Sequence, residues 1–244
     1  MRYLVIHFDA PLMSFGAPSV GEIRPIDIWP SLSMVTGLVA NALGVQAYER
    51  ERLQRLQNII IFGTRIDRWG RSLVDFQTAQ LSKKNDLLWR SDGTGPDERS
   101  GGDSTYRAPT LRYKYYLNNF KCSIVISLLP QENSLSLENI ASAFIYPERP
   151  LFIGRSCCIP SEPFFQGEWV EAETIPDALA SVKKNTNFEG NEFLAEWPDI
   201  NEPNSLFILR KRRVRRTDMR DWINDIHVGE RFVFRGEIQR KERI

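Results

Sequence analysis

Cysteine and histidine are scarce in this sequence of 244 residues. Cys157 and Cys158 are adjacent, Cys122 stands alone, and the histidines are His7 and His227. Three cysteines at this spacing cannot build a disulfide framework, and their odd number is typical of a reducing compartment, so we expect a cytoplasmic protein. Neither histidine is near the cysteines in the sequence. This excludes the usual spacing of zinc ligands, and we expect no metal and no other cofactor.

Long apolar runs are also missing. No segment has the length of a membrane-spanning helix, and His7 and Asp9 interrupt the short apolar start before a signal-peptide core can form. We therefore expect no membrane partner. Hydrophobic residues make up 42% of the chain and charged residues 26%, which is the composition of a folded globular protein with a sizeable core.

The common sequence motifs of catalytic and nucleotide-binding sites are absent as well. There is no Walker motif, no serine nucleophile elbow and no pair of acidic residues at a convincing metal-binding spacing. His7 lies inside an expected strand on the same side as Tyr3 and Val5, where a buried, hydrogen-bonded histidine is the commoner outcome. His227 is expected at the surface. The sequence therefore predicts a binding protein and not an enzyme.

Charge is balanced overall, with 32 basic and 31 acidic residues, but it is unevenly distributed. Residues 160–203 hold ten acidic residues against two lysines, whereas residues 205–244 hold twelve basic residues against six acidic ones. Six of the seven residues from Arg210 to Arg216 are basic. Such a cluster attracts phosphate groups or an acidic protein surface, and it can also be a solvated strand edge whose charges prevent self-association.

The apolar patterns predict an α+β fold. Residues 3–9 are expected to form a buried strand, and a helix is expected after Pro30, with Ser31 and Ser33 as caps. Further elements are predicted at 48–56 (helix), from 59 toward 69 (strand), 122–129 (strand), after Ser136 (helix) and 151–153 (strand). This order of strand, helix, strand, strand, helix, strand is that of a ferredoxin-like, RRM-like βαββαβ domain.

Two stretches fall outside that order. Residues 82–108 are rich in Gly, Ser, Asp and Arg between strand-like runs at 73–81 and 110–117, which predicts an extended hairpin with a protruding insert. After residue 160, an acidic linker is expected to precede strands at 206–214 and 231–238. We therefore divide the chain into a palm at 1–160 and a smaller, mostly β extension at 161–244.

The loop at residues 10–16 is a first candidate for binding. It carries Met13 and Phe15 beside Gly16, and such side chains can stack on unpaired bases. A phenylalanine at this kind of position is, however, more often part of the core.

A turn and a helix start are further candidates. Gly154-Arg155-Ser156 combines backbone amides, a hydroxyl and a guanidinium that can hold phosphates. The helix after Pro30 offers amides and the hydroxyls of Ser31 and Ser33 to an anion, although ordinary capping explains both serines equally well.

Six short motifs follow one another along the chain. They are APLMSFG at 10–16, Arg24-Pro25, Pro30-Ser31 with Ser33 opening a helix that ends at Leu43-Gly44, Asp75-Phe76-Gln77-Thr78, Lys114-Tyr115-Tyr116-Leu117, and Gly154-Arg155 followed by Cys158 and Pro163. Their order and spacing over roughly residues 1–165 resemble the CasD subunits of type I-E CRISPR Cascade, in the RAMP superfamily. The basic run at 212–216 resembles the family's C-terminal strand, whereas residues 168–204 match no part of it that we can name.

The resemblance implies a ferredoxin-like palm with an arm, the thumb, at about residues 77–113. It implies a non-catalytic subunit that caps and anchors the 5′ handle of the CRISPR RNA in the Cascade surveillance complex for antiviral defence. The implied partners are this handle, a neighbouring backbone subunit that the thumb contacts, the large subunit and, indirectly, target DNA. RNA contacts are expected at Met13, Phe15, Gly16, Arg24, Ser31, Ser33, Lys114, Gly154, Arg155, Ser156, Arg212, Arg213 and Arg215.

Four positions depart from the family. Met13 stands where Gln is usual, Phe15 replaces Trp, Leu32 replaces a basic residue and Lys114 replaces Arg. Lysine keeps the positive charge at 114 but loses the bidentate fork of a guanidinium.

Two other functions stay open. One is a metal-independent endoribonuclease that cuts CRISPR repeats, with Tyr113, Tyr115 or Tyr116 beside Lys114 acting as acid or base on a ribose 2′-hydroxyl. The other is a protein-interaction module without RNA contact.

Overall fold

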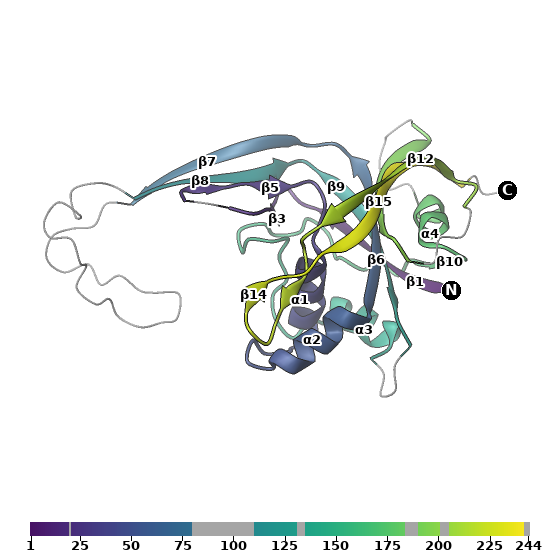
Figure 1. Cartoon of the computed structure of the whole chain (residues 1–244), viewed down its shortest axis with the longest axis horizontal. Coiled ribbons are helices and arrows are strands. Elements are labelled where there is room, and N and C mark those ends of the chain that lie inside the picture. The colour runs from purple at the N-terminus through teal and green to yellow at the C-terminus, as the bar shows by residue number, and fades with distance from the viewer. Residues whose placement is uncertain (20, 80–109, 131–134, 184–189, 201–204, 242–244) are drawn as a thin grey trace, which may run out of the picture.

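A seven-stranded antiparallel sheet forms the centre of this mixed α+β protein (Figure 1). The computed structural model describes residues 1–19, 21–79, 110–130, 135–183, 190–200 and 205–241. Across the sheet, the strands are β10 (Trp169–Glu171), β1 (Arg2–Asp9), β9 (Lys121–Leu128), β6 (Ile60–Arg68), β11 (Glu192–Pro198), β15 (Arg231–Gln239) and β12 (Ile208–Arg216). The α+β expectation is confirmed.

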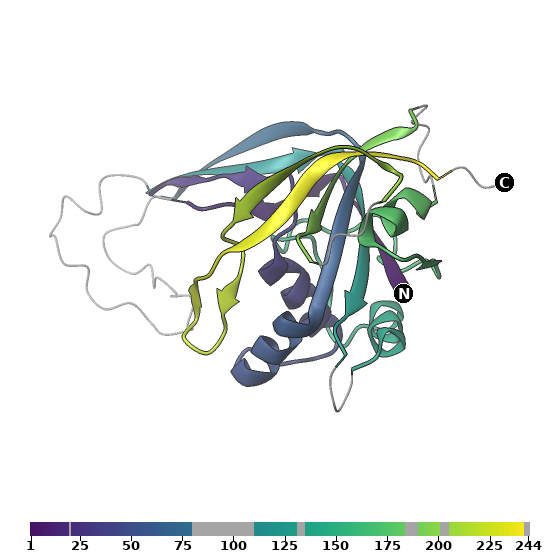
Figure 2. The same ribbon diagram turned by 45° about the vertical axis from the view of Figure 1, so that its right-hand side comes forward.

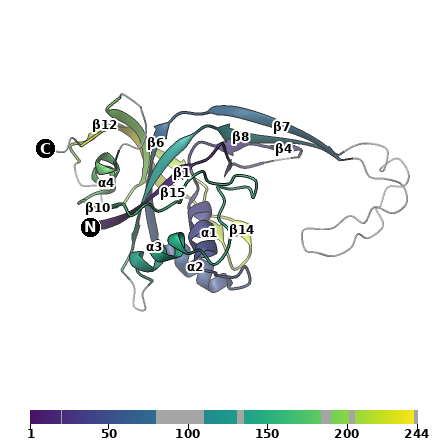
Figure 3. The same ribbon diagram turned by 180° about the vertical axis from the view of Figure 1, so that it is seen from behind.

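Helices cover both faces of the sheet. On one face lie α1 (Leu32–Ala42), α2 (Arg50–Ile59) and α3 (Leu137–Ile145), which group together in Figure 3. On the other face lies α4 (Ile175–Ser181), as Figure 2 shows. Among the described helices, we find none with the length and apolar character needed to span a bilayer.

The side-chain alternation of β1 gives the protein two apolar cores. Leu4, Ile6 and Phe8 pack with α1, α2 and α3, whereas Tyr3 and Val5 pack with α4. Neighbouring residues of a strand point to opposite faces, so one strand supplies both cores. The predicted buried first strand is confirmed.

The predicted helix starts are confirmed by their caps. The Ser31 hydroxyl accepts a hydrogen bond from the Met34 N–H at 3.1 Å, and Ser136 forms a capping box with Asn139 at the start of α3. These side chains satisfy amides that the first turn of a helix leaves without an internal partner.

A long hairpin projects from the body of the protein (Figure 1). It consists of β7 (Arg71–Ala79) and β8 (Thr110–Asn118), which pair antiparallel over their full length, as predicted. The other edge of β8 pairs with β2 (Leu12–Met13) and with β4 (Ile23–Arg24). Beside them, β3 (Phe15–Gly16) pairs with β5 (Ile26–Asp27). The predicted insert at 82–108 lies outside the described residues.

The strand predicted at 151–153 is wrong. These residues are irregular, because the Ile153 N–H donates to the Cys158 carbonyl at 2.8 Å and the Ile153 carbonyl accepts from the Ser14 N–H at 3.1 Å. The backbone N–H and carbonyl of Ile153 are therefore hydrogen-bonded to a turn and to a loop, and they are not available for pairing with a strand. The position beside β1 is occupied by β10 instead.

The segment expected to be an acidic linker contains regular structure. It holds β10, α4 and β11, and β11 pairs with β6 at Ala195↔Arg65 and with β15 along its whole length. The strands of the C-terminal extension therefore continue the sheet of the palm. The division of the chain at residue 160 stays a prediction.

Candidate nucleic-acid interface

A groove of about 1030 Å³ lies where the N-terminal loops, the start of α1 and the C-terminal strands meet. It brings together seven of the thirteen predicted RNA-contact residues: Gly16, Arg24, Ser31, Ser33, Gly154, Arg155 and Arg215. These residues come from segments separated by almost 200 positions in the sequence, so the fold alone makes them neighbours. Met13, Phe15, Lys114, Ser156, Arg212 and Arg213 do not line it.

The turn at Gly154 packs directly on the first loop. Gly154 has a φ of +90°, and a Cβ placed on it would lie 1.7 Å from the Ser14 carbonyl oxygen. Only glycine fits both the backbone angle and this close approach. Gly154 therefore fixes the distance between the two loops that form one end of the groove.

Arg155 is held by backbone carbonyls from two strands. Its Nη1 donates to the Tyr115 carbonyl at 2.7 Å, and its Nη2 donates to the Arg24 carbonyl at 3.2 Å. The guanidinium also lies 4.6 Å from the centre of the Tyr116 ring. These contacts use part of the guanidinium's hydrogen-bonding capacity and hold a half-buried positive charge in the groove.

Two basic residues lie side by side next to Arg155. Arg24 of β4 is the register partner of Lys114 of β8, and the Arg24 Nη1 donates to the Gly21 carbonyl at 2.7 Å. Lys114 is not among the lining residues, yet its charge adds to the positive potential at this end of the groove.

The expectation that Met13 and Phe15 stack on bases is wrong, because both side chains are 0% exposed. The Phe15 ring lies 6.0 Å from the rings of Phe8 and Phe120. The pairings of β2 with β8 and of β3 with β5 hold this loop against the core. Gly16, which follows, is exposed and lines the groove.

The amides that begin α1 are not available to a phosphate. The Leu32 N–H donates to the Asp218 carboxylate at 3.0 Å, and the Ser33 N–H donates to the Asp218 carbonyl at 3.1 Å. Ser31 accepts from the Met34 N–H, as ordinary capping predicts. The Ser31 and Ser33 hydroxyls, 3.1 Å apart, still line the groove.

Asp218 is a buried carboxylate held by two arginines. Burial opposes its ionisation, but hydrogen bonds from Arg231, both at 2.7 Å, and the nearby charge of Arg216 lower the pKa of Asp218. The anion-binding position at the start of α1 is therefore occupied by a carboxylate of the chain itself.

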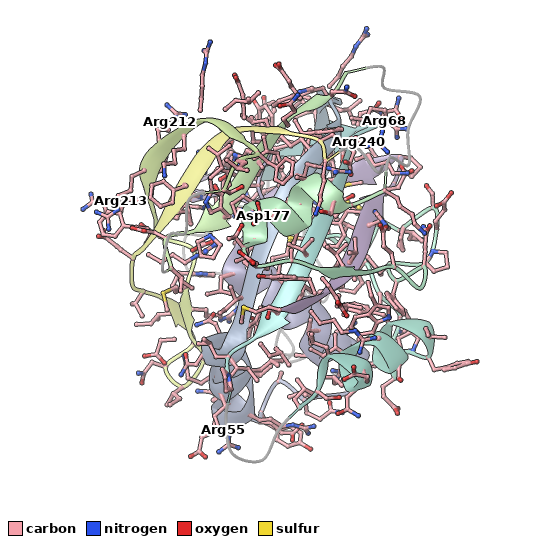
Figure 4. The ribbon with its side chains drawn as sticks, turned by 90° about the vertical axis from the view of Figure 1, so that its right-hand side faces the viewer. Arg55, Arg68, Asp177, Arg212, Arg213 and Arg240 are labelled. Carbon is pink, nitrogen blue, oxygen red and sulfur yellow. The ribbon has the colours of Figure 1, made fainter. Side chains whose placement is uncertain are left out.

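The remaining predicted residues lie elsewhere. Ser156 is exposed beside the groove-lining turn residues, and Arg212 lines a smaller groove with Trp29 and Leu194. Arg213 donates to Asp199 at 2.7 Å and lies over the Phe232 ring. Figure 4 shows Arg212 and Arg213 at the rim formed by the outer strand β12.

Sequence reasoning missed a hairpin that lines the groove. The strands β13 (Arg220–Asp221) and β14 (Ile226–His227) pair, and Arg220, Trp222 and His227 are among the lining residues. His227 is exposed, as predicted. The sequence has no local signal for the position of this hairpin, because side chains of α2 set it: Gln54 accepts from the Trp222 N–H and Gln57 from the Arg220 N–H.

The tyrosines considered for catalysis do not line the groove. The Tyr113 ring packs against Phe76 at 4.9 Å, and the Tyr116 hydroxyl is 3.6 Å from the Cys157 sulfur. Burial raises the pKa of Tyr116, which disfavours the phenolate that a general base would need.

A buried cluster has the residue types of a hydrolytic triad but not its function. His7 lies 3.0 Å from the Ser123 hydroxyl and 3.2 Å from the Glu168 carboxylate. Ser123, however, is 0% exposed, and its hydroxyl donates to Asp67 and not to His7. A serine that no substrate can reach cannot act as a nucleophile. The prediction that His7 is buried and hydrogen-bonded is confirmed.

Among the residues that the structure describes, no three His, Cys, Asp or Glu side chains are grouped so that they could hold a metal ion.

The chain matches the model of the family described as CRISPR-associated protein (Cas_Cas5) over residues 3–234. A curated relative is the CRISPR system Cascade subunit CasD of Escherichia coli (strain K12), which is 22% identical over 165 residues, 68% of this chain and 70% of the relative. The resemblance found in the sequence motifs is thereby confirmed.

Two solved structures have a similar fold. One is described as a CRISPR RNA-guided surveillance complex, with a TM-score of 0.65, 18% identity, and coverage of 98% of this chain and 90% of the other. The second is described as the crystal structure of a Cas protein, with a TM-score of 0.65, 21% identity, and coverage of 98% and 95%.

Proposed function

This chain belongs to the CRISPR-associated protein (Cas_Cas5) family, and from that premise we propose that it is an RNA-binding structural subunit of a CRISPR surveillance complex. Its role is to cap and anchor the 5′ handle of the CRISPR RNA without cutting it. The observation that carries this proposal is the groove, in which seven residues predicted from scattered motifs lie together.

The charge distribution of the groove suits a phosphate backbone. Two carboxylates line it, but Asp218 pairs with Arg231 and Asp27 pairs with Arg216 at 3.3 Å. With these acids neutralised and Arg215 paired with Glu230 at 3.3 Å, Arg24 and Arg155 leave an excess of positive charge. Phosphate contacts of this kind position a nucleic acid and dominate its affinity.

The remaining partners are those that the family resemblance implies, and the architecture is compatible with them. We interpret the palm as ferredoxin-like, with β10 as its fourth strand, because β10, β1, β9 and β6 then lie in the order four, one, three, two. The β7–β8 hairpin is the thumb, and its exposed Val74, Phe76 and Tyr113 suit contact with a neighbouring backbone subunit. Through this assembly the chain would adjoin the large subunit and, indirectly, target DNA.

Salt-dependent binding tests the proposal. The full chain is titrated into fluorescently labelled repeat RNA that carries the 5′ handle, and fluorescence anisotropy is followed at several salt concentrations. The double variant Arg24→Ala with Arg155→Ala should bind more weakly, and its salt slope should fall by about 0.7 for each phosphate that is no longer neutralised. Arg215→Ala provides a second variant, since this side chain is 65% exposed and its removal is not expected to disturb folding.

The matched control is Arg55→Ala, an exposed residue of α2 that is labelled in Figure 4 and is not among the lining residues of the groove. It removes one exposed arginine and should leave both affinity and slope at wild-type values. The proposed function would be overturned if the folded double variant Arg24→Ala/Arg155→Ala and the folded Arg215→Ala variant both bound the RNA with wild-type affinity and salt slope.

A further inference from the structure

Besides the residues proposed to bind phosphate, the groove is lined by two aromatic side chains. Among the described lining residues, the aromatic rings are those of Trp222 and His227, both on the β13–β14 hairpin. Building on the proposed function, we propose that this hairpin is the base-stacking platform of the groove, the role that the sequence assigns to Met13 and Phe15. Its ligand is the unpaired bases of single-stranded RNA.

The hairpin is anchored before any ligand arrives. The Trp222 indole N–H donates to Gln57 at 3.1 Å, its backbone N–H donates to Gln54 at 3.0 Å, and Arg50 donates to the Ile223 carbonyl at 2.7 Å. All three partners belong to α2. Because these contacts already order the ring, stacking on it requires little further loss of side-chain entropy.

The indole ring lies between α1 and the Arg220 side chain. A Cβ at Gly37 of α1 would lie 3.9 Å from the Trp222 ring atom Cη2, which is an ordinary van der Waals distance, so this edge of the ring is next to the helix. The Arg220 guanidinium lies 4.8 Å from the ring centre and is tethered by an ion pair with Asp225. A guanidinium plane is itself a surface on which bases stack.

His227 extends the platform across the hairpin. It is the register partner of Arg220, so both side chains are on the same face of the two-stranded ribbon. Its imidazole is exposed and lines the groove together with Trp222. The other described lining residues carry no aromatic ring, and their guanidinium and hydroxyl groups can contact phosphate and sugar.

Two probes separate base contacts from phosphate contacts. The first is a labelled eight-nucleotide RNA of mixed sequence, and the second has the same length and the same number of phosphates but abasic sites in place of all bases. The wild-type chain should prefer the base-containing probe. In the variants His227→Ala and Trp222→Ala, affinity for this probe should fall roughly tenfold for each base that no longer stacks, with the salt slope unchanged.

Conservative variants distinguish stacking from a structural role. His227→Phe and Trp222→Phe keep a ring and should retain the preference for bases, although Trp222→Phe loses the bond to Gln57. Because His227 is exposed, His227→Ala tests the proposal even if Trp222→Ala does not fold. The control is Tyr146→Ala, an 83% exposed aromatic at the end of α3, which should change nothing.

Two results would overturn the proposal that the hairpin is a base-stacking platform. One is that His227→Ala binds the base-containing probe as tightly as the wild type does. The other is that the wild type binds both probes with equal affinity. If the arginine variants still lowered the salt slope, phosphate binding in the groove would stand and only this inference would fall. If neither set of variants had an effect, the proposed function would fall as well.

Discussion

Asp218 accepts a hydrogen bond from the backbone N–H of Leu32 at 3.0 Å, which places a carboxylate from the segment between β12 and β13 at the start of α1. The same carboxylate pairs with Arg231. The anion-binding position at the start of α1 is thus occupied from within the chain, and the Ser31 and Ser33 hydroxyls are the groups that the start of this helix still offers to the proposed RNA.

Asp218→Asn should destabilise the protein by about 3 kcal/mol at pH 7, because the largely buried Arg231 loses the carboxylate that it pairs with and the buried Arg216 loses one of three. Urea unfolding measures this loss. The control Asp225→Asn removes an exposed carboxylate paired with Arg220 and should cost less than about 1 kcal/mol. Equal stability of Asp218→Asn and the wild type would contradict this role of the buried carboxylate.

Asp218 should make the protein more stable at neutral pH than at acidic pH. The pKa of this carboxyl is lower in the folded than in the unfolded state, so its contribution is fully present above its unfolded pKa, about 3.9. The contribution disappears as pH falls through the folded pKa. Unfolding curves from pH 7 to pH 2 should therefore show a smaller acid-induced loss for Asp218→Asn than for the wild type, and parallel curves would argue against it.

Gly154→Ala should lower stability by about 3 kcal/mol or more and weaken RNA binding, because the new methyl group collides with the Ser14 carbonyl. Gly167→Ala is a matched control: its φ is +80°, but a Cβ there meets no atom within 4 Å. The control should lose only about 1 to 2 kcal/mol of backbone strain and keep its RNA binding. Thermal unfolding and anisotropy measure both variants, and similar losses in the two would exclude the close approach as the cause.

Two arginines of β6 should differ sharply in their effect on stability. Arg65 is fully buried, pairs with Asp67 and donates to the Leu179 and Val182 carbonyls at the end of α4. Arg65→Met should cost about 3 to 5 kcal/mol because the buried Asp67 keeps its hydrogen bond from Ser123 but loses the positive charge of Arg65. Arg68→Met, which removes a 38% exposed partner of Asp9, should cost less than about 1 kcal/mol in the same urea titration. Comparable losses would mean that burial does not set these energies.

The protein should leave repeat RNA intact. Labelled repeat RNA is incubated with the full chain in the presence of a chelator and analysed on a denaturing gel. We expect no specific product, since Tyr113 packs on Phe76 and Tyr116 is buried with a raised pKa. A specific cut that disappears in Tyr115→Phe or Lys114→Ala would favour the endoribonuclease instead.

Local sequence patterns predicted the elements whose signals are local. Ser31 and Ser136 mark the starts of α1 and α3, and the strand-like runs that flank the insert form β7 and β8. In contrast, the short strand expected at 151–153 does not form, because the partners of Ile153 are Cys158 and Ser14, and such pairings cannot be deduced from three apolar residues.

The candidate site shows the same division between local and long-range information. Motifs indicated Arg24 and Arg155, but the burial of Met13 and Phe15 depends on packing with Phe8 and Phe120. Nor does any spacing relate Asp218 to Leu32, 186 positions away. The high content of acidic residues led to the prediction of a linker where β11 forms. In this strand the apolar Phe193, Ala195 and Trp197 occupy every second position, which is the alternation expected of a strand. The residues between them are Glu192, Leu194 and Glu196.

Crosslinking shows where the handle lies on the protein, and it is the sharpest test of the proposed RNA-binding groove. CRISPR RNA with 4-thiouridine at single handle positions is bound to the full chain, irradiated, and the crosslinked peptides are identified by mass spectrometry. We expect crosslinks to the groove, in the peptides that contain Gly16, Arg155 and Trp222. Crosslinks confined to α4 and the opposite face of the sheet, with none in the groove, would show that the handle binds elsewhere.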